Sequence, residues 1–187
     1  MLANVSNVPS AESLGVPRPR LLAGFVLAGA LALPAGLAHA GWTAAIQPDP
    51  ISRQARCLLR SDPVLTPAGH DDTTPVTLVF NGSSLVAITQ SDLDGSFADL
   101  QLTVDKNPPI RSAKIVRDML LVFDQNLPDL VRQLQEGHQA TVYLRFWPTW
   151  PVTQTFPVTF SLAGFRKAHD AMNQSCQAPA GTNPVPR

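Results

Sequence analysis

The chain has 187 residues, of which 14 are basic and 14 acidic, so its formal charge at neutral pH is zero. A neutral chain with dispersed charges lacks the electrostatic footprint of a protein that binds nucleic acid. It also lacks the polybasic segment that holds proteins to anionic lipid. Charge therefore excludes nucleic acid and an anionic membrane surface as expected partners.

The first element in chain order is a secretory leader. A short basic stretch at 18–20 precedes an uncharged apolar run at 21–37, and the small residues Ala38 and Ala40 follow it. These are the three parts of a cleavable signal. The run is about 17 residues long, shorter than the roughly 20 that span a bilayer, so an uncleaved membrane anchor is the weaker alternative. We predict cleavage before Gly41 and a periplasmic or secreted protein with no membrane attachment afterwards.

Removal of the signal peptide, residues 1–40, leaves about 147 residues, which fits one domain with its own core. We predict a single β-rich domain over 41–176 and a flexible, proline-containing tail over 177–187. Arg18, Arg20 and Glu12 leave with the leader, so 12 basic and 13 acidic residues remain. The mature protein therefore has a formal charge of −1, still close to neutral.

The mature chain has two cysteines, Cys57 and Cys176, near its two ends. In an exported protein, two thiols usually form one disulfide. This bridge would close a loop of about 120 residues and stabilise the fold by roughly 4–5 kcal/mol in the entropic description. The alternative is a pair of unpaired, buried thiols. Redox catalysis is not expected, because no Cys-x-x-Cys motif lowers the pKa of either thiol.

Residue patterns predict that the domain consists mainly of β-strands. The predicted strands are 76–80, 84–89, 98–105, 115–123 (as one strand or two short ones), 140–146 and 152–162. Asn81-Gly82 suits a tight two-residue hairpin turn with two positive φ angles. Pro157 lacks an amide donor, so the last strand is expected at a sheet edge or with a bulge.

Two short helices are predicted between the strands. The first covers 127–136, with Asn126 as its N-cap, Gly137 as its end and an apolar stripe at helical spacing. The second follows Ser161, with apolar positions recurring over 162–172. The predicted disulfide would attach this second helix to an early strand. A β-rich domain of this size needs two packed layers, so we predict a mainly β fold, either a sandwich or a flattened barrel with two short helices.

The mature chain shows no recognisable constellation of reactive residues. Its histidines are His70, His138 and His169, and His70-Asp71-Asp72 lacks further metal ligands at recognisable spacing. There is no Gly-x-Ser-x-Gly elbow and no phosphate-binding glycine loop. We therefore predict a protein that is not an enzyme and needs no metal or cofactor. The alternative is an envelope hydrolase whose Ser, His and Asp residues come together only in the fold.

The aromatic segment at 143–150 is the predicted recognition surface. Tyr143, Arg145 and Trp147 share one strand face, and Trp150 follows between two prolines. If this face is exposed, an arginine between two rings can bind anions, sugars or another protein. The alternative is that the face packs under a helix or the other sheet, and that Trp150 fills one end of the fold. All four residues are candidates for a ligand surface, and the sequence does not identify the ligand.

The segment 160–168 resembles the Ser-Leu-x-Gly-Phe-x-x-Ala ending of the invasion-associated locus B family, which comprises exported bacterial proteins with a β-rich domain. The matching positions are Ser161, Leu162, Gly164, Phe165 and Ala168, and the preceding helix and strand come in the same order. Family members carry additional cysteines that this chain lacks between its own two. The resemblance implies an exported protein and no particular reaction. We therefore expect a non-enzymatic binding protein of the bacterial envelope, whose partner is an unidentified envelope or host protein.

Overall fold

The computed structural model describes residues 41–68, 72–148 and 154–175. The predicted leader and tail lie outside these residues, and so do His70, Asp71, Trp150 and Cys176.

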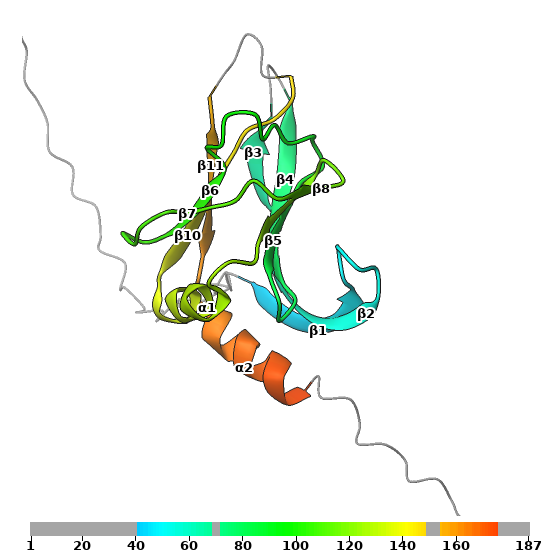
Figure 1. Ribbon diagram of the computed structural model, residues 1–187. Helices are drawn as coiled ribbons and strands as arrows, with labels where there is room; N and C mark the ends of the chain where they lie inside the picture. The colour runs from blue at the N-terminus through cyan, green and yellow to red at the C-terminus, as the bar shows by residue number, and fades with distance from the viewer. Residues whose placement is uncertain (1–40, 69–71, 149–153, 176–187) are drawn as a thin grey trace, which may run out of the picture. The chain divides into compact units, whose positions relative to one another are not determined.

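The first sheet contains seven antiparallel strands (Figure 1). Six of them lie side by side in the order β1 (Trp42–Pro48), β2 (Ala55–Ser61), β4 (Thr73–Phe80), β5 (Leu85–Ile88), β9 (Leu120–Phe123) and β8 (Ile115–Val116). Strand β3 (Val64–Pro67) pairs with β4 off this path. The apolar stretch at 115–123 thus forms two short strands, one of the two forms predicted for it.

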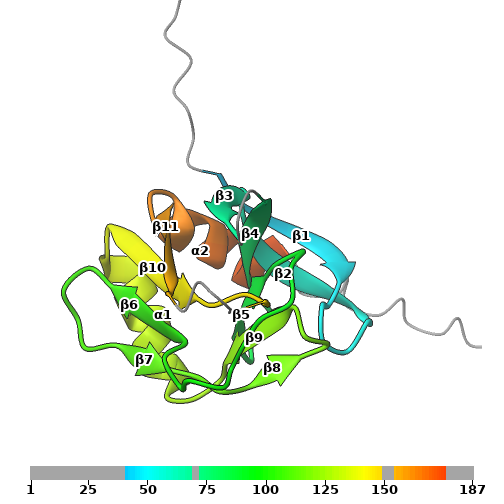
Figure 2. The same cartoon turned by 90° about the horizontal axis from the view of Figure 1, so that it is seen from above.

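The second sheet contains four antiparallel strands in the order β11 (Phe156–Ser161), β10 (Gln139–Leu144), β6 (Gln101–Val104) and β7 (Ile110–Arg111). Pro157 lies on β11, which is an edge strand of this sheet, as predicted from its missing amide donor. The two sheets form the two layers of a sandwich (Figures 1 and 2). The predicted mainly β fold with two short helices is confirmed.

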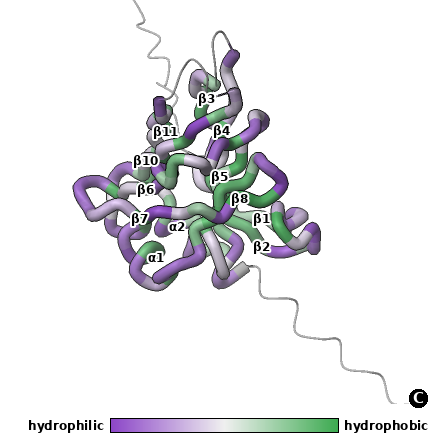
Figure 3. The backbone as a smooth tube through the Cα atoms, turned by 45° about the horizontal axis from the view of Figure 1, so that its top comes forward, coloured by the Kyte–Doolittle hydropathy of each residue, from purple (hydrophilic) through white to green (hydrophobic). Residues whose placement is uncertain are grey.

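The core lies between the two sheets and draws on both. On β6 and β10 of the second sheet alternate residues are buried, since successive side chains point to opposite faces of a strand. In the first sheet, β5 and β9 and the second half of β4 are buried at consecutive positions. Hydrophobic segments accordingly follow the strands, whereas the connecting loops are more hydrophilic (Figure 3). The largest fully buried side chains include Leu59, Leu78, Leu85 and Phe123 from the first sheet and Leu102 and Leu144 from the second.

Helices α1 (Leu127–Glu136) and α2 (Phe165–Ser175) lie at the same end of the sandwich (Figure 1). The predicted apolar stripe of α1 is confirmed, because Leu130 and Leu134 are fully buried. The predicted side-chain cap is wrong. Asn126 makes no capping hydrogen bond and instead has a left-handed backbone, with φ of 46°.

The predicted start of the second helix is also wrong. Ser161 is the last residue of β11, where it pairs with Gln139, and the Leu162 amide then donates to the His138 carbonyl at 2.9 Å. Because the ladder continues to this point, the helix begins only at Phe165. Gly164 makes the turn between them with a φ of 87°, a conformation that glycine adopts without steric cost.

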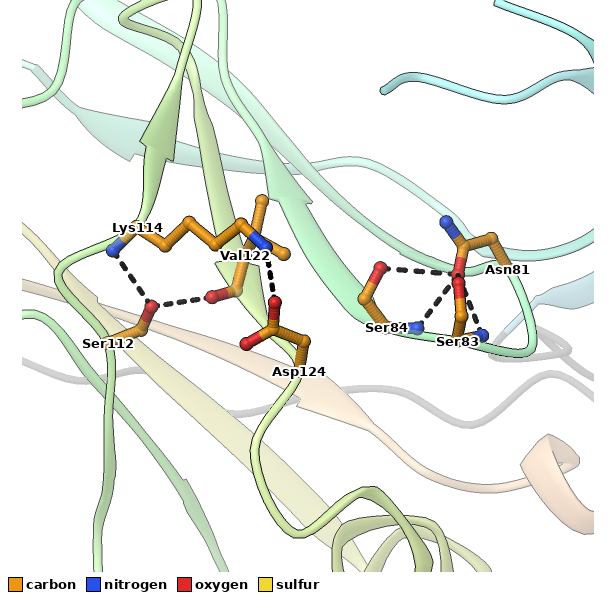
Figure 4. A network of polar contacts seen from close by, with 7 residues as sticks. All are labelled: Asn81, Ser83, Ser84, Ser112, Lys114, Val122 and Asp124. Carbon is orange, nitrogen blue, oxygen red and sulfur yellow. Dashed lines mark hydrogen bonds and ion pairs between the residues drawn. The ribbon is translucent and has the colours of Figure 1, made fainter. Parts of the chain in front are cut away.

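The predicted hairpin after β4 exists, but its turn is longer than predicted. Phe80 pairs with Leu85, which leaves the four residues 81–84 in the loop. Within this loop, only Gly82 has a positive φ angle. The Asn81 side-chain oxygen accepts the amides of Ser83 and Ser84 at 3.0 and 2.8 Å, so the side chain closes the wider turn (Figure 4).

Candidate functional site

The candidate site lies where the chain leaves β10. There, residues 145–147 pair with 92–94, a segment that precedes β6. The Asp94 amide donates to the Arg145 carbonyl and the Trp147 amide donates to the Asp92 carbonyl, each at 2.9 Å. This pairing keeps the backbone extended past the end of β10. Arg145 and Trp147 therefore lie on the face opposite the buried ring of Phe146.

Arg145 is buried, with 5% of its surface exposed. Its guanidinium carbon lies 4.3 Å from the ring centroid of Phe97, a cation–π contact. The guanidinium also forms an ion pair with Asp99. The prediction that the Arg145 side chain is exposed to solvent is thus wrong. The loop at 95–99 covers this side chain, rather than a helix or the other sheet. Local spacing could not reveal Phe97 or Asp99, because the pairing of two distant segments brings them to Arg145.

Two large rings remain exposed at this site. Trp147 is 52% exposed and Phe97 is 54% exposed. We refer to Phe97, Arg145 and Trp147 as the aromatic patch. Tyr143 lies on the same strand face and is half-buried between Gln101 of β6 and Pro157 of β11. The structure therefore places three of the four predicted surface residues on one face, and Trp150 lies outside the described residues.

The sheet face beside the aromatic patch is polar. Thr141 is half-buried there, and its hydroxyl lies 2.9 Å from the hydroxyl of Thr159 on β11. Thr103 of β6 pairs with Thr141 from the other side. A ligand that covers the two rings would thus meet hydroxyl groups next to an apolar surface.

His138 lines an open surface pocket of about 590 Å³ between the end of α1 and the β6–β7 loop, and its side chain is 91% exposed. Its Nδ1 is 3.6 Å from Asp105 Oδ2. The backbone amides of His138 and Gln139 donate to the Asp105 carboxylate and hold its pKa below the usual value. A carboxylate with a lowered pKa is a weak base, whereas general acid–base catalysis favours a pKa near the working pH.

His169 lies on α2 against the core. Its Nδ1 is 3.0 Å from the Gln135 amide nitrogen and 3.3 Å from that of Asn173, and its ring stacks on Phe165. These contacts describe a packed helix residue. In the part of the chain that the structure describes, no three His, Cys, Asp or Glu side chains lie close enough together to hold a metal ion. Within that same part, no helix is long and apolar enough to cross a bilayer.

Cys57 is half-buried on β2, and its sulfur lies 3.9 Å from the Met172 carbonyl oxygen on α2. Helix α2 ends at Ser175, directly before Cys176 in the sequence. The end of α2 therefore lies near Cys57, as the predicted disulfide requires. The bridge itself stays a prediction, because Cys176 lies outside the described residues.

The motif that resembles the invasion-associated locus B family has clear structural roles here. It spans the end of β11, the turn at Gly164 and the start of α2, where Phe165 is fully buried and its ring lies 4.8 Å from that of Trp42, edge to face. These roles concern packing, so the resemblance stays a prediction. No family model, no curated protein and no solved structure matches this chain.

Proposed function

We propose that this protein is an exported, non-enzymatic binding protein of the bacterial envelope, and that it recognises a partner protein through the aromatic patch. The observation that carries the proposal is a pair of half-exposed aromatic residues: Phe97, which packs on the buried Arg145, and Trp147, two residues after Arg145 on the same face. Aromatic residues and arginine dominate the energetically important positions of protein interfaces.

The rigidity of the patch supports this proposal. Phe97 packs on the Arg145 guanidinium, which Asp99 holds, and the Trp147 backbone is hydrogen-bonded to Asp92. Side chains that are already ordered lose less conformational entropy when a partner binds. The neighbouring Thr141 and Tyr143 add hydrogen-bonding groups at the border of the patch, where interfaces are usually polar.

The hydrolase alternative has no comparable support. It requires a histidine within reach of both a serine and a carboxylate. His138 has a carboxylate neighbour in Asp105, but none of the described residues that line its pocket is a serine. The polar contacts of His169 within the described residues are to the amides of Gln135 and Asn173.

The test is partner capture from an envelope extract by the exported protein. We expect Trp147→Ala or Phe97→Ala to reduce recovery of the captured protein at least about tenfold, as loss of an interface anchor does. Ile46→Ala and Leu65→Ala are matched controls, because these side chains are 69% and 70% exposed on other strands. The controls should retain capture. If all four variants captured as much of the partner as the wild type, each with an unchanged unfolding midpoint, the aromatic patch would not be the binding surface.

A further inference from the structure

The start of the β1–β2 ladder has a contact that a regular ladder lacks. Trp42 pairs with Ser61, so Gly41 lies opposite Asp62, and the Asp62 amide donates to the Gly41 carbonyl at 2.8 Å. In a regular antiparallel pair, the Gly41 amide would donate back to the Asp62 carbonyl. Here it donates to the Asp62 carboxylate at 3.0 Å, and the Asp62 carbonyl instead accepts the Ser61 hydroxyl at 2.9 Å.

The carboxylate lies directly over Gly41. A Cβ atom at this position would be 2.4 Å from Asp62 Oδ2, closer than real contacts allow. The neighbours on both strands are fixed, because Ser61 is buried and the buried Trp42 indole donates to the Ser161 carbonyl at 2.8 Å. A larger residue at position 41 would therefore have to displace the Asp62 side chain, whereas glycine leaves the carboxylate beside its own nitrogen.

We propose that Asp62 is a binding site for the α-ammonium group of Gly41, which forms when the leader is removed. This inference rests on the export and cleavage included in the proposed function. Hydrolysis of the Ala40–Gly41 peptide bond by a leader peptidase consumes one water molecule, leaving a carboxylate on Ala40 and a primary amine on Gly41. The amine is mostly protonated at neutral pH. Cleavage thus replaces a neutral donor beside Asp62 with a cation.

The consequence concerns the stability of the first strand. A new chain terminus normally frays, because the ordering contacts of the preceding residues are lost. At Gly41, cleavage instead creates an ion pair and a charge-assisted hydrogen bond, which is stronger than a neutral one. Because the Gly41–Asp62 contact is exposed to solvent, the effect is modest, as for other surface ion pairs.

The experiment measures how fast an acylating reagent modifies the α-amine of the exported protein at neutral pH, followed by peptide mass spectrometry. The deprotonated amine is the reactive form, so pairing of the ammonium with a carboxylate slows the reaction. We expect Asp62→Asn, which keeps the shape but removes the charge, to accelerate acylation about two- to fivefold. Asp72→Asn, at an exposed carboxylate on another segment, should leave the rate unchanged.

A second variant tests the same contact in case the Asp62→Asn protein does not fold. Gly41→Ala places a Cβ where the carboxylate lies, so it should displace Asp62 and accelerate acylation similarly. Rates equal to wild type in both variants would overturn the proposal. N-terminal sequencing separates this outcome from a failure of export: a mature chain that does not begin at Gly41 would overturn the processing step as well. The capture experiment with the aromatic patch is independent of both results.

Discussion

Among single residues, Asp49 shows how one carboxylate organises a turn. It is 1% exposed, its Oδ1 accepts the amides of Ile51 and Ser52 at 2.9 and 2.6 Å, and its Oδ2 accepts the Asn81 side-chain amide at 2.7 Å. Burial raises the pKa of this carboxyl, but the hydrogen bonds together outweigh burial and hold the pKa below its usual value. The turn also positions Ile51 against a small apolar cluster of Val86, Leu120 and Val122.

We predict that Asp49→Asn destabilises the fold by about 1–3 kcal/mol at neutral pH, because its new amide group would face the Asn81 donor. The pKa of Asp49 is lower in the folded than in the unfolded state. Its stabilising effect is therefore complete above the unfolded pKa and is lost as pH falls through the folded pKa. Urea unfolding from neutral to strongly acid pH should show the difference between wild type and variant closing in acid. A difference independent of pH would contradict this account.

The ion pair beneath the aromatic patch gives a second prediction at this scale. The side chain of Asp99 is 32% exposed and that of Arg145 only 6% exposed, so removing the carboxylate leaves a buried guanidinium without its counter-charge. Because solvent around Asp99 weakens this interaction, we expect Asp99→Asn to lower the free energy of unfolding, measured with urea, by about 1–3 kcal/mol. Asp124→Asn, which breaks the exposed pair with Lys114 (Figure 4), should cost less than about 1 kcal/mol. Equal losses would show that burial of Arg145 has no energetic weight.

Among the elements, α1 meets the second sheet at Gly137. The φ angle of this glycine is −79°, which any residue adopts, so the requirement for glycine is spatial. A Cβ would lie 2.6 Å from a Val104 methyl and 2.8 Å from the Gln133 carbonyl oxygen. We predict that Gly137→Ala destabilises the protein by about 1–3 kcal/mol through overpacking.

Gly95→Ala is the matched control for that measurement. Its Cβ would meet only the end of the Ile115 side chain, at 2.9 Å, which can rotate away. We expect this control to change the free energy of unfolding by less than about 1 kcal/mol. If the two alanine variants unfold at the same urea concentration, α1 does not pack as tightly against β6 as the structure indicates.

The elements also show which features sequence reasoning can recover. Helix α1 and strand β10 were predictable, because each presents one apolar face to the core at its own period. Pro157 predicted an edge strand correctly, because a residue without an amide donor cannot complete the hydrogen bonds of a central strand. The first three strands at 42–67 were not predicted individually, since neighbouring residues such as Ala44 and Ala45 do not alternate in polarity.

The recognition surface was predictable only in part, for a related reason. The spacing of Tyr143, Arg145 and Trp147 predicted correctly that they share one strand face. Local spacing does not contain the pairing of 92–94 with 145–147, which brings Phe97 over Arg145. Tertiary contacts of this kind decide exposure, and here they bury the arginine and leave a phenylalanine exposed.

For the described domain as a whole, α2 packs the last element of the fold against the first two strands. The helix contacts β1 and β2, and its first residue, Phe165, packs edge to face on Trp42. At its other end, the Met172 carbonyl lies beside Cys57. Apolar packing thus fixes the start of the helix, whereas the predicted disulfide would fix its end.

We predict that loss of this disulfide lowers the free energy of unfolding by about 2–4 kcal/mol, the usual range for native bridges and below the roughly 4–5 kcal/mol of the entropic description, because the unfolded chain regains the freedom of a long loop. Alkylation of the exported protein without reductant should leave Cys57 and Cys176 unmodified, as judged by mass spectrometry. Reductant should lower the urea midpoint of the wild type to that of Cys57→Ser and should not change the midpoint of the variant. Two alkylated cysteines in the native exported protein would contradict the bridge. In that case, packing of Phe165 and Met172 against the first sheet would have to hold α2 in place without it.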